Sequence, residues 1–317
     1  MPRRAAGAPP ALALGAMNFG KRTPEDESER IVRRALERGI RVFDTANVYN
    51  GGESERILGR ALGRDRDRVV VASKVGLDRV GGKPEGLSPL TIERAIAGTL
   101  QRLGTDRVDV YYLHAPDHET PIERTLAAMK ALVDSGRVRA WGVSNYAAWQ
   151  ILEMDHLADG LGLARPVVAQ MLCNVLHREL EVEYFAFARR YPVHTTVYNP
   201  LAGGLLTGKH RYEEAPAKGS RFDDNAMYRR RYWTRAMFER VERLREIAQR
   251  EGIGLVQLAY AWVASRPDVD SILVGPASVE QLDQAIDAVG LRLSGDALAR
   301  IDELSREWRG TDTHYVR

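Results

Sequence analysis

The chain has 317 residues, 44% of them hydrophobic, and a formal net charge of +3 at pH 7. This length suffices for one large core. The modest positive excess argues against nucleic-acid binding, which needs basic residues clustered on one face. One cysteine, Cys173, excludes an intrachain disulfide, and no run approaches the roughly 18 apolar residues of a membrane span. We expect a cytoplasmic protein without nucleic-acid or membrane partners.

The chain then alternates between short β-rich runs and longer stretches with apolar residues at helical spacing. Residues 1–10, rich in Pro and Ala, are expected to be frayed. The predicted strands are residues 11–15, 41–45, 69–74, 108–114, 139–144, 167–170, 193–199 and 271–275. The clearest predicted helices are residues 28–38, 91–103, 120–135, 236–251 and 256–265.

Strands that alternate with helices predict parallel βαβ units, and eight of them at this length predict a single (β/α)8 TIM barrel over residues 1–317. The alternative is an open doubly wound sheet. That fold favours a Gly-x-Gly-x-x-Gly turn after an early strand, and the sequence contains none. The irregular stretches 76–89, 201–227 and the tail after Trp308 are expected to be functional loops at the C-terminal face of the barrel.

Polar residues end most of the predicted strands. Taken singly, each has an ordinary structural explanation: an Asp can cap the next segment, and a His can pack in a core. In a barrel, however, the C-terminal strand ends meet at one face, where the chemistry of such enzymes sits. Their coincidence therefore predicts an active site. The residues are Asp44, Lys74, His114, Ser144, Asn145, Gln170, Asn199 and Pro200.

Tyr49 follows Asp44 closely enough for its loop to return over the barrel mouth. An unperturbed tyrosine, with a pKa near 10, is a weak acid at pH 7, and a nearby ammonium lowers that pKa. Lys74 is the expected ammonium, Asp44 its partner, and His114 the group that orients a substrate oxygen. The pattern predicts proton donation to a carbonyl oxygen. No side chain donates hydride, so a cofactor is required.

These residues and their order resemble the aldo-keto reductase family over essentially the whole chain. The resemblance rests on Phe43-Asp44-Thr45-Ala46 with Tyr49, then Gly52-Glu53-Ser54-Glu55, Ser73-Lys74, Leu113-His114, Gly142-Val143-Ser144-Asn145 and Gln170. It implies a nicotinamide cofactor bound without a Rossmann motif and reduction of an aldehyde or ketone. It also implies Tyr49 as general acid tuned by Lys74 and Asp44, with Ser144, Asn145 and Gln170 holding the carboxamide.

The later sequence is similar to the aflatoxin aldehyde (succinic semialdehyde) reductase branch of that family, through the run from Tyr198 to Lys209 and through Arg221-Phe222. This implies that Tyr198 stacks on the nicotinamide and that a Gly-rich loop wraps the pyrophosphate. Arg221 and Lys209 add positive charge there. The further cofactor residues of this loop are Asn199, Pro200, Leu201, Gly203, Gly204 and Leu206.

The same branch implies a substrate pocket formed by His114, Tyr228, Arg231 and Arg317, in which the arginines hold a carboxylate. Small or carboxylated aldehydes are the expected substrates. An arginine-rich run such as 229–235 otherwise indicates a solvated helix face. The resemblance suggests a homodimer, and no metal site is expected.

The adenosine end of the cofactor is implied at the turn before residue 279. Ser278 is a predicted N-cap, and a helix N-terminus attracts phosphate. The expected contacts are Gly275, Ser278, Gln281 and Gln284, but Ala277 and Ala285 depart from the pattern of the branch. We expect NADPH as the cofactor, with NADH as the alternative.

Two other functions use the same features. A non-catalytic regulatory protein that resembles potassium-channel β-subunits could keep the barrel and the cofactor site, because fold alone does not determine activity. A Schiff-base aldolase could use Lys74 as a nucleophile. The aldolase chemistry does not need Tyr49 and Asp44 in this arrangement, and it leaves the Gly-rich loop and Ser144-Asn145 without a role.

Overall fold

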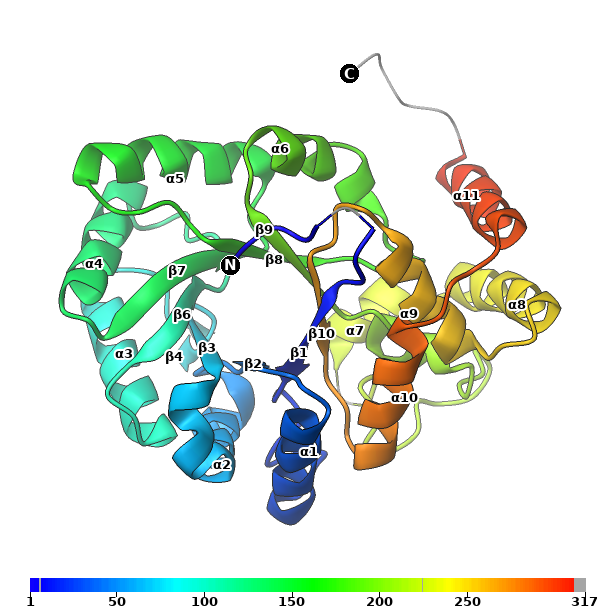
Figure 1. Cartoon of the computed structure of the whole chain (residues 1–317), viewed down its shortest axis with the longest axis horizontal. Coiled ribbons are helices and arrows are strands. Elements are labelled where there is room, and N and C mark those ends of the chain that lie inside the picture. Colours follow the sequence, from blue (N-terminus) through cyan, green and yellow to red (C-terminus); the bar gives the residue numbers. More distant parts are fainter. Residues whose placement is uncertain (6, 224, 311–317) are drawn as a thin grey trace.

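The computed structural model describes residues 1–5, 7–223 and 225–310. Within these ranges, eight parallel strands close a barrel in the order β1-β10-β9-β8-β7-β6-β3-β2 (Figure 1). The strands are β1 (Ala11–Gly15), β2 (Val42–Asp44), β3 (Val70–Val75), β6 (Val108–Leu113), β7 (Val138–Ser144), β8 (Val168–Leu172), β9 (His194–Tyr198) and β10 (Ser271–Val274). The predicted (β/α)8 barrel is confirmed, and each predicted strand overlaps an observed one.

Helices surround the barrel (Figure 1). They are α1 (Glu25–Glu37), α2 (Glu53–Leu62), α3 (Pro89–Leu103), α4 (Ile122–Asp134), α5 (Ala148–Leu161), α6 (Tyr184–Arg190), α7 (Ala226–Tyr232), α8 (Arg235–Arg250), α9 (Leu255–Ser265), α10 (Val279–Val289) and α11 (Gly295–Arg309). α1 shows why they pack inward: Ile31, Val32 and Ala35 are buried on one face, whereas its first turn is acidic. None of the helices in the described ranges combines the length and apolarity that a membrane span requires.

The register of the barrel brings the polar strand ends together. Asp44 pairs with Ala72 of β3, and Lys74 pairs with Tyr112 of β6. Ser144 pairs with Gln170 of β8. Because all these strands are parallel, their C-terminal ends form one rim, and the loops that follow them surround the barrel mouth.

The N-terminal residues differ from the expected frayed segment. The backbone nitrogen of Arg4 donates to Oδ1 of Asp270 at 2.7 Å, and Nε of Arg3 lies 2.9 Å from Oδ2 of the same carboxylate. Nδ1 of His194 lies 2.7 Å from the carbonyl oxygen of Pro2. A buried carboxylate next to β10 therefore anchors residues that composition alone made look unstructured.

A small hairpin lies in the 76–89 loop and was not predicted. Strands β4 (Arg79–Val80) and β5 (Lys83–Pro84) are antiparallel and exposed. Gly81 and Gly82 connect them with φ values of 59° and 82°, which suits a tight two-residue hairpin turn. Each strand has only two residues, too few to show the alternation by which strands are recognised.

Candidate active site

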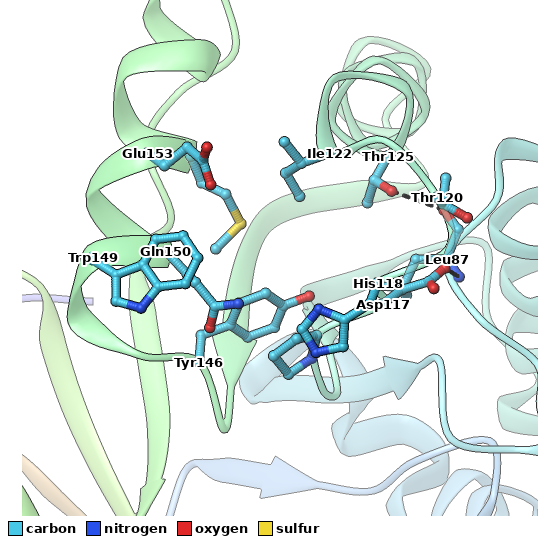
Figure 2. A pocket seen from close by; sticks show the side chains of 12 residues that line it. Leu87, Asp117, His118, Thr120, Ile122, Thr125, Tyr146, Trp149, Gln150 and Glu153 are labelled. Atoms are coloured by element: carbon cyan, nitrogen blue, oxygen red, sulfur yellow. Dashed lines mark hydrogen bonds between the residues drawn. The ribbon is translucent and has the colours of Figure 1, made fainter.

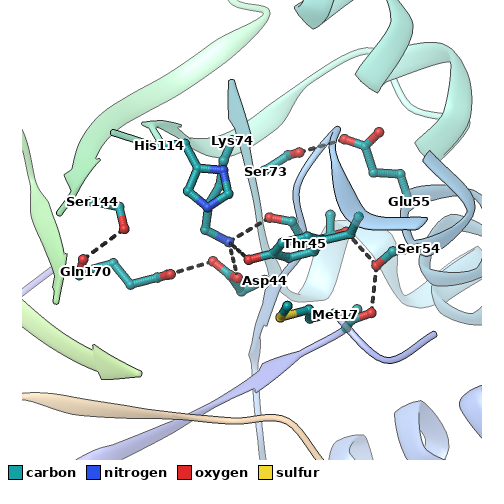
Figure 3. Close-up of polar contacts among 12 residues, drawn as sticks. Met17, Asp44, Thr45, Ser54, Glu55, Ser73, Lys74, His114, Ser144 and Gln170 are labelled. Atoms are coloured by element: carbon teal, nitrogen blue, oxygen red, sulfur yellow. Dashed lines mark hydrogen bonds and ion pairs between the residues drawn. The ribbon is translucent and has the colours of Figure 1, made fainter. Parts of the chain in front are cut away.

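A buried ion pair between Lys74 of β3 and Asp44 of β2 forms the centre of the site (Figure 3). The Lys74 side chain is 0% exposed and that of Asp44 3%. Nζ of Lys74 also donates to the carbonyl oxygen of Thr45 at 2.8 Å. Nε2 of Gln170 donates to the second oxygen of Asp44 at 2.8 Å. Each charge thus has several partners, as buried charges require.

The pair keeps Lys74 protonated. Burial by itself lowers the pKa of an ammonium, but the negative charge of Asp44 and contacts with Tyr49 outweigh it, so the pKa of Lys74 is raised. An amine that stays charged is a poor nucleophile. This geometry therefore disfavours the Schiff-base alternative and agrees with an electrostatic role.

Tyr49 lies over this pair, in the short helix η1 (Tyr49–Gly52) that follows β2. Its hydroxyl oxygen is 3.4 Å from Nζ of Lys74, and its ring meets that of His114 edge-on at a centroid distance of 5.9 Å. The neighbouring Asn50, with a φ of 52°, donates to the carbonyl oxygens of Met17 and Phe19. The expected group of Tyr49, Asp44, Lys74 and His114 is therefore assembled.

Two opposed effects set the pKa of Tyr49, and the sequence predicted only the smaller one, the influence of Lys74. Burial raises the pKa of Tyr49 above its ordinary value, and Lys74 only partly opposes this. Sequence reasoning considered the ammonium but not the burial of the phenol. Tyr49 is consequently a fully protonated hydroxyl at neutral pH, as a proton donor must be.

His114 follows β6 and is neutral at physiological pH. Burial and then the charge of Lys74 lower its pKa well below the ordinary value of 6.5. Its Nδ1 atom is buried and has no hydrogen-bond partner among the described residues. A buried polar atom without a partner is costly. The imidazole therefore suits a site completed by a bound molecule.

If the reaction is the expected carbonyl reduction, with neutral His114 as hydrogen-bond donor and Tyr49 as proton donor, these pKa directions predict a broad pH plateau. The rate should then fall at low pH only below a value well under 6.5, where His114 becomes protonated. It should fall at high pH only above a value of 10.0, where Tyr49 loses its proton. A profile of kcat/KM against pH at saturating cofactor checks this. A falling limb centred within the neutral range would contradict it.

Polar contacts between β3 and the helices α2 and α3 hold the site in position. Oγ of Ser73, next to Lys74, donates to the fully buried carboxylate of Glu55 at 2.6 Å (Figure 3). Nε of Arg102 on α3 lies 2.6 Å from the other oxygen of Glu55. Oγ of Ser54 donates to the carbonyl oxygen of Ala16 at 2.7 Å. The contacts made by Glu55, from the Gly52-Glu53-Ser54-Glu55 motif, thus hold β3 in place.

The predicted carboxamide residues lie together at the rim. Oγ of Ser144 donates to the carbonyl oxygen of Gln170 at 2.9 Å, and Nδ2 of Asn145 donates to that of His114 at 3.0 Å. The hydroxyl of Tyr198, at the end of β9, donates to Oδ1 of Asn145 at 2.7 Å. Burial raises the pKa of Tyr198 to about 12, so its ring stays neutral. Together, the Tyr198 ring and the side chains of Ser144, Asn145 and Gln170 offer a neutral ring and amides to a planar ligand.

The Gly-rich loop after β9 is a tight backbone cradle. Gly203 and Gly204, in η4 (Ala202–Thr207), have φ values of 70° and 101°, and a Cβ on Gly203 would lie 2.7 Å from the Tyr228 ring. Oδ1 of Asn199 accepts from the amide of Gly203 at 2.6 Å. The amide of Gly204 donates to the carbonyl oxygen of Leu201 at 2.9 Å, so both glycine amides have partners within the loop. Glycine is therefore required at position 203 by its positive φ and by close packing against Tyr228.

Some of the predicted loop residues have structural roles. Nδ2 of Asn199 donates to the Tyr232 hydroxyl at 2.8 Å, and the Leu206 side chain is fully buried. Pro200 is buried and Leu201 half-buried, whereas Lys209 is exposed. The amide of Leu206 also donates to the carbonyl oxygen of Leu201 at 3.2 Å, so Asn199 and Leu206 stabilise the loop itself, which sequence alone could not show.

Arginines gather around Tyr228 on the other side of the loop. The guanidinium carbon of Arg221 lies 5.6 Å from the Tyr228 ring centroid, and that of Arg231 5.9 Å. Arg221 donates to neutral acceptors, Oδ1 of Asn18 and Sδ of Met17, each at 2.9 Å. Arg221 and Arg231, the arginines expected to bind anionic groups, are thus both next to the Tyr228 ring. Arg317 lies outside the described residues.

The first turn of α10 places the adenosine-end candidates. Gly275 and Gln284 are exposed, and Oγ of Ser278 caps the helix by accepting from the amide of Gln281 at 3.3 Å. Oε1 of Gln281 accepts from the amide of Ala277 at 2.9 Å. The predicted N-cap is confirmed, and Gln281 already satisfies one of the nearby amides.

Sequence reasoning missed Asn18 and Arg22, in the loop after β1. Nδ2 of Asn18 donates to the carbonyl oxygens of Gly275 and Pro276 at 3.0 and 3.2 Å. Nε of Arg22 donates to the carbonyl oxygen of Gly219 at 3.0 Å. These contacts join the loops after β1, β9 and β10. The sequence did carry a signal for this loop: a polar residue lies shortly after the first predicted strand. The end of that strand was not among the strand ends considered.

A separate cavity of about 170 Å³ lies between the loop after β6 and the start of α5 (Figure 2). Asp117, His118, Tyr146 and Trp149 are among its lining residues. None of the four catalytic candidates lines it. It is therefore distinct from the catalytic centre.

Comparison with known proteins agrees with this geometry. The sequence model of the Aldo/keto reductase family matches residues 11–306. Aldo-keto reductase family 7 member A3 of Homo sapiens is 37% identical over 317 residues, covering 91% of each chain. Aflatoxin B1 aldehyde reductase member 2 of Mus musculus is 36% identical, covering 90% of this chain and 82% of its own.

A protein named for a different role is similar as well. A probable voltage-gated potassium channel subunit beta of Oryza sativa subsp. japonica is 35% identical, covering 88% of this chain and 87% of its own. Together with the barrel and the assembled catalytic group, the matches to reductases establish the family. The chain belongs to the aldo/keto reductase family.

Proposed function

We propose that this protein reduces an aldehyde or ketone to an alcohol, with NADPH or NADH as hydride donor and Tyr49 as general acid. The observation that carries the proposal is the Tyr49 hydroxyl 3.4 Å from a buried, charged Lys74 and beside a neutral His114. When bound, a reduced nicotinamide supplies the hydride. The side chains supply the proton and orient the carbonyl oxygen.

Each side chain has a defined part in this reaction. His114 can donate a hydrogen bond to the carbonyl oxygen and orient it. Tyr49 gives its proton to that oxygen as negative charge develops on it, and Lys74 stabilises the resulting tyrosinate. Asp44 holds Lys74 in position and charged, and Gln170 in turn holds the Asp44 carboxylate. Water then restores the proton on Tyr49.

The remaining residues suit an extended dinucleotide. Tyr198 offers a ring for stacking, and Ser144, Asn145 and Gln170 offer amide and hydroxyl groups. Gly204 has open space beside it, which leaves room for a phosphate. Arg221 adds a guanidinium held by neutral acceptors. We propose NADPH as the expected cofactor, with NADH as the alternative.

A screen of cofactor consumption tests this function. NADPH and NADH are each offered with matched neutral and carboxylated aldehydes, and oxidation is followed by loss of nicotinamide absorbance. We expect turnover with at least one aldehyde class. Tight cofactor binding without turnover across the whole panel would instead favour the regulatory alternative. The similarity to a potassium channel subunit beta is the specific observation behind that alternative.

We further propose that Arg231 binds the carboxylate of an acidic aldehyde. Replacing it with Ala should raise KM for succinic semialdehyde by roughly 10- to 100-fold, because a hydrogen bond to a charged group contributes about 1.5–3 kcal/mol. KM for the neutral butanal should change little. Arg230→Ala is the matched control, since Arg230 is exposed on the same helix. An equal loss with both aldehydes would contradict the assignment.

A further inference from the structure

A carboxylate from another helix occupies the first turn of α10. Oε1 of Glu27, on α1, accepts a hydrogen bond from the backbone nitrogen of Val279 at 2.9 Å. Its Oε2 lies 2.6 Å from Nη1 of Arg30, and the Glu27 side chain is only 18% exposed. Amides at the start of a helix attract anions. At the start of α10, the anion is the carboxylate of Glu27 itself.

The other groups of this turn leave little room for a second anion. The amide of Ala277 donates to Gln281, and the amide of Gln281 donates to Ser278. Glu280, also in the first turn, is exposed and carries another carboxylate. Arg30 is the cation in contact with Glu27, and it is 61% exposed, so water screens it more than it screens Glu27.

This turn is continuous with the cofactor loops. Asn18 joins them, because it donates to the carbonyl oxygens of Gly275 and Pro276 and accepts from Arg221. The adenosine end of the proposed cofactor is expected at this turn, beside Val279. NADPH would bring a phosphate of nearly two negative charges there, whereas NADH brings a neutral hydroxyl that can donate to a carboxylate.

We propose that Glu27 is a cofactor-specificity residue that disfavours the 2′-phosphate and thereby weakens the preference of this chain for NADPH over NADH. It does so by occupying the Val279 amide and by placing like charge against the phosphate. The inference rests on the proposed function, because it requires the adenosine end of the cofactor to lie at this turn.

Binding measurements without any aldehyde test the inference. Isothermal titration calorimetry gives Kd for NADPH and NADH with the wild type and Glu27→Gln, which keeps the size and an acceptor oxygen but removes the charge. We expect Glu27→Gln to lower the ratio of Kd for NADPH to Kd for NADH by roughly tenfold, mainly through tighter NADPH binding. The fragments 2′,5′-ADP and 5′-AMP should show the same shift.

Asp26→Asn is the matched control, because it removes the same charge from an exposed neighbour on α1. Its ratio should stay at the wild-type value. Glu27→Ala, whose folding is checked by its melting temperature, should move the ratio in the same direction as Glu27→Gln. An unchanged ratio in both Glu27 variants, or an equal shift in Asp26→Asn, would overturn the inference while leaving the reductase proposal intact. Failure of the wild type to bind either dinucleotide would overturn both.

Discussion

Replacing Tyr49 with Phe should abolish reduction while leaving the cofactor bound. Phe keeps the ring that meets His114 at 5.9 Å, so packing at the mouth is preserved. It removes the hydroxyl that lies 3.4 Å from Lys74. A positioned general acid contributes about 10²- to 10⁴-fold, and kcat should fall by that factor. The measurement is aldehyde-dependent oxidation of the cofactor, compared with Kd for the cofactor alone.

A tyrosine outside the site provides the control for this experiment. Tyr191 lies at the end of α6 and is 37% exposed, so Tyr191→Phe should behave as the wild type. If Tyr49→Phe retained turnover, the proton would have to come from another group, and the assignment of Tyr49 would fail. If it lost cofactor binding in parallel with turnover, Tyr49 would be a binding residue rather than the acid.

Replacing Lys74 with Met should both destabilise and inactivate the protein. Met keeps an unbranched side chain that is one atom shorter, but it leaves the carboxylate of Asp44, only 3% exposed, without its cation. Breaking one side of a buried pair costs about 3–5 kcal/mol. We therefore expect a lower urea midpoint together with loss of reduction, since nothing then stabilises the tyrosinate.

The double variant Asp44→Asn with Lys74→Met separates stability from catalysis. Neutralising both partners removes the uncompensated charge, so most of the lost stability should return. Activity should not return, because the ammonium is still missing. A Lys74→Met protein as stable as the wild type would show that the Asp44 carboxylate is not held charged in a buried pair.

Much of the site could be predicted because it follows from local patterns. Asp44, Lys74 and His114 each end a recognisable apolar run, and the parallel register of a barrel must bring such ends to one rim. The (β/α)8 fold follows from the same alternation. Ser278 was predictable as an N-cap because its side-chain oxygen can bond the first turn without tertiary help.

The remainder depends on contacts distant in sequence. Glu27 meets Val279 across 252 positions, and Arg3 meets Asp270 across 267. Neither pair leaves a local pattern. The effect of burial on the pKa of Tyr49 was missed for a related reason, since burial of a loop side chain depends on what packs over it. Leu206 likewise matched the pattern of a cofactor loop, yet its side chain lies in the core.

Isotope transfer is the most direct test of carbonyl reduction by this protein. The wild type is incubated with 4-nitrobenzaldehyde and NADPH or NADH that carries deuterium at both C4 positions, and the alcohol is analysed by mass spectrometry and NMR. The account predicts one deuterium on the carbinol carbon and a solvent proton on the oxygen. Absence of the alcohol, or an alcohol without deuterium at that carbon, would contradict it.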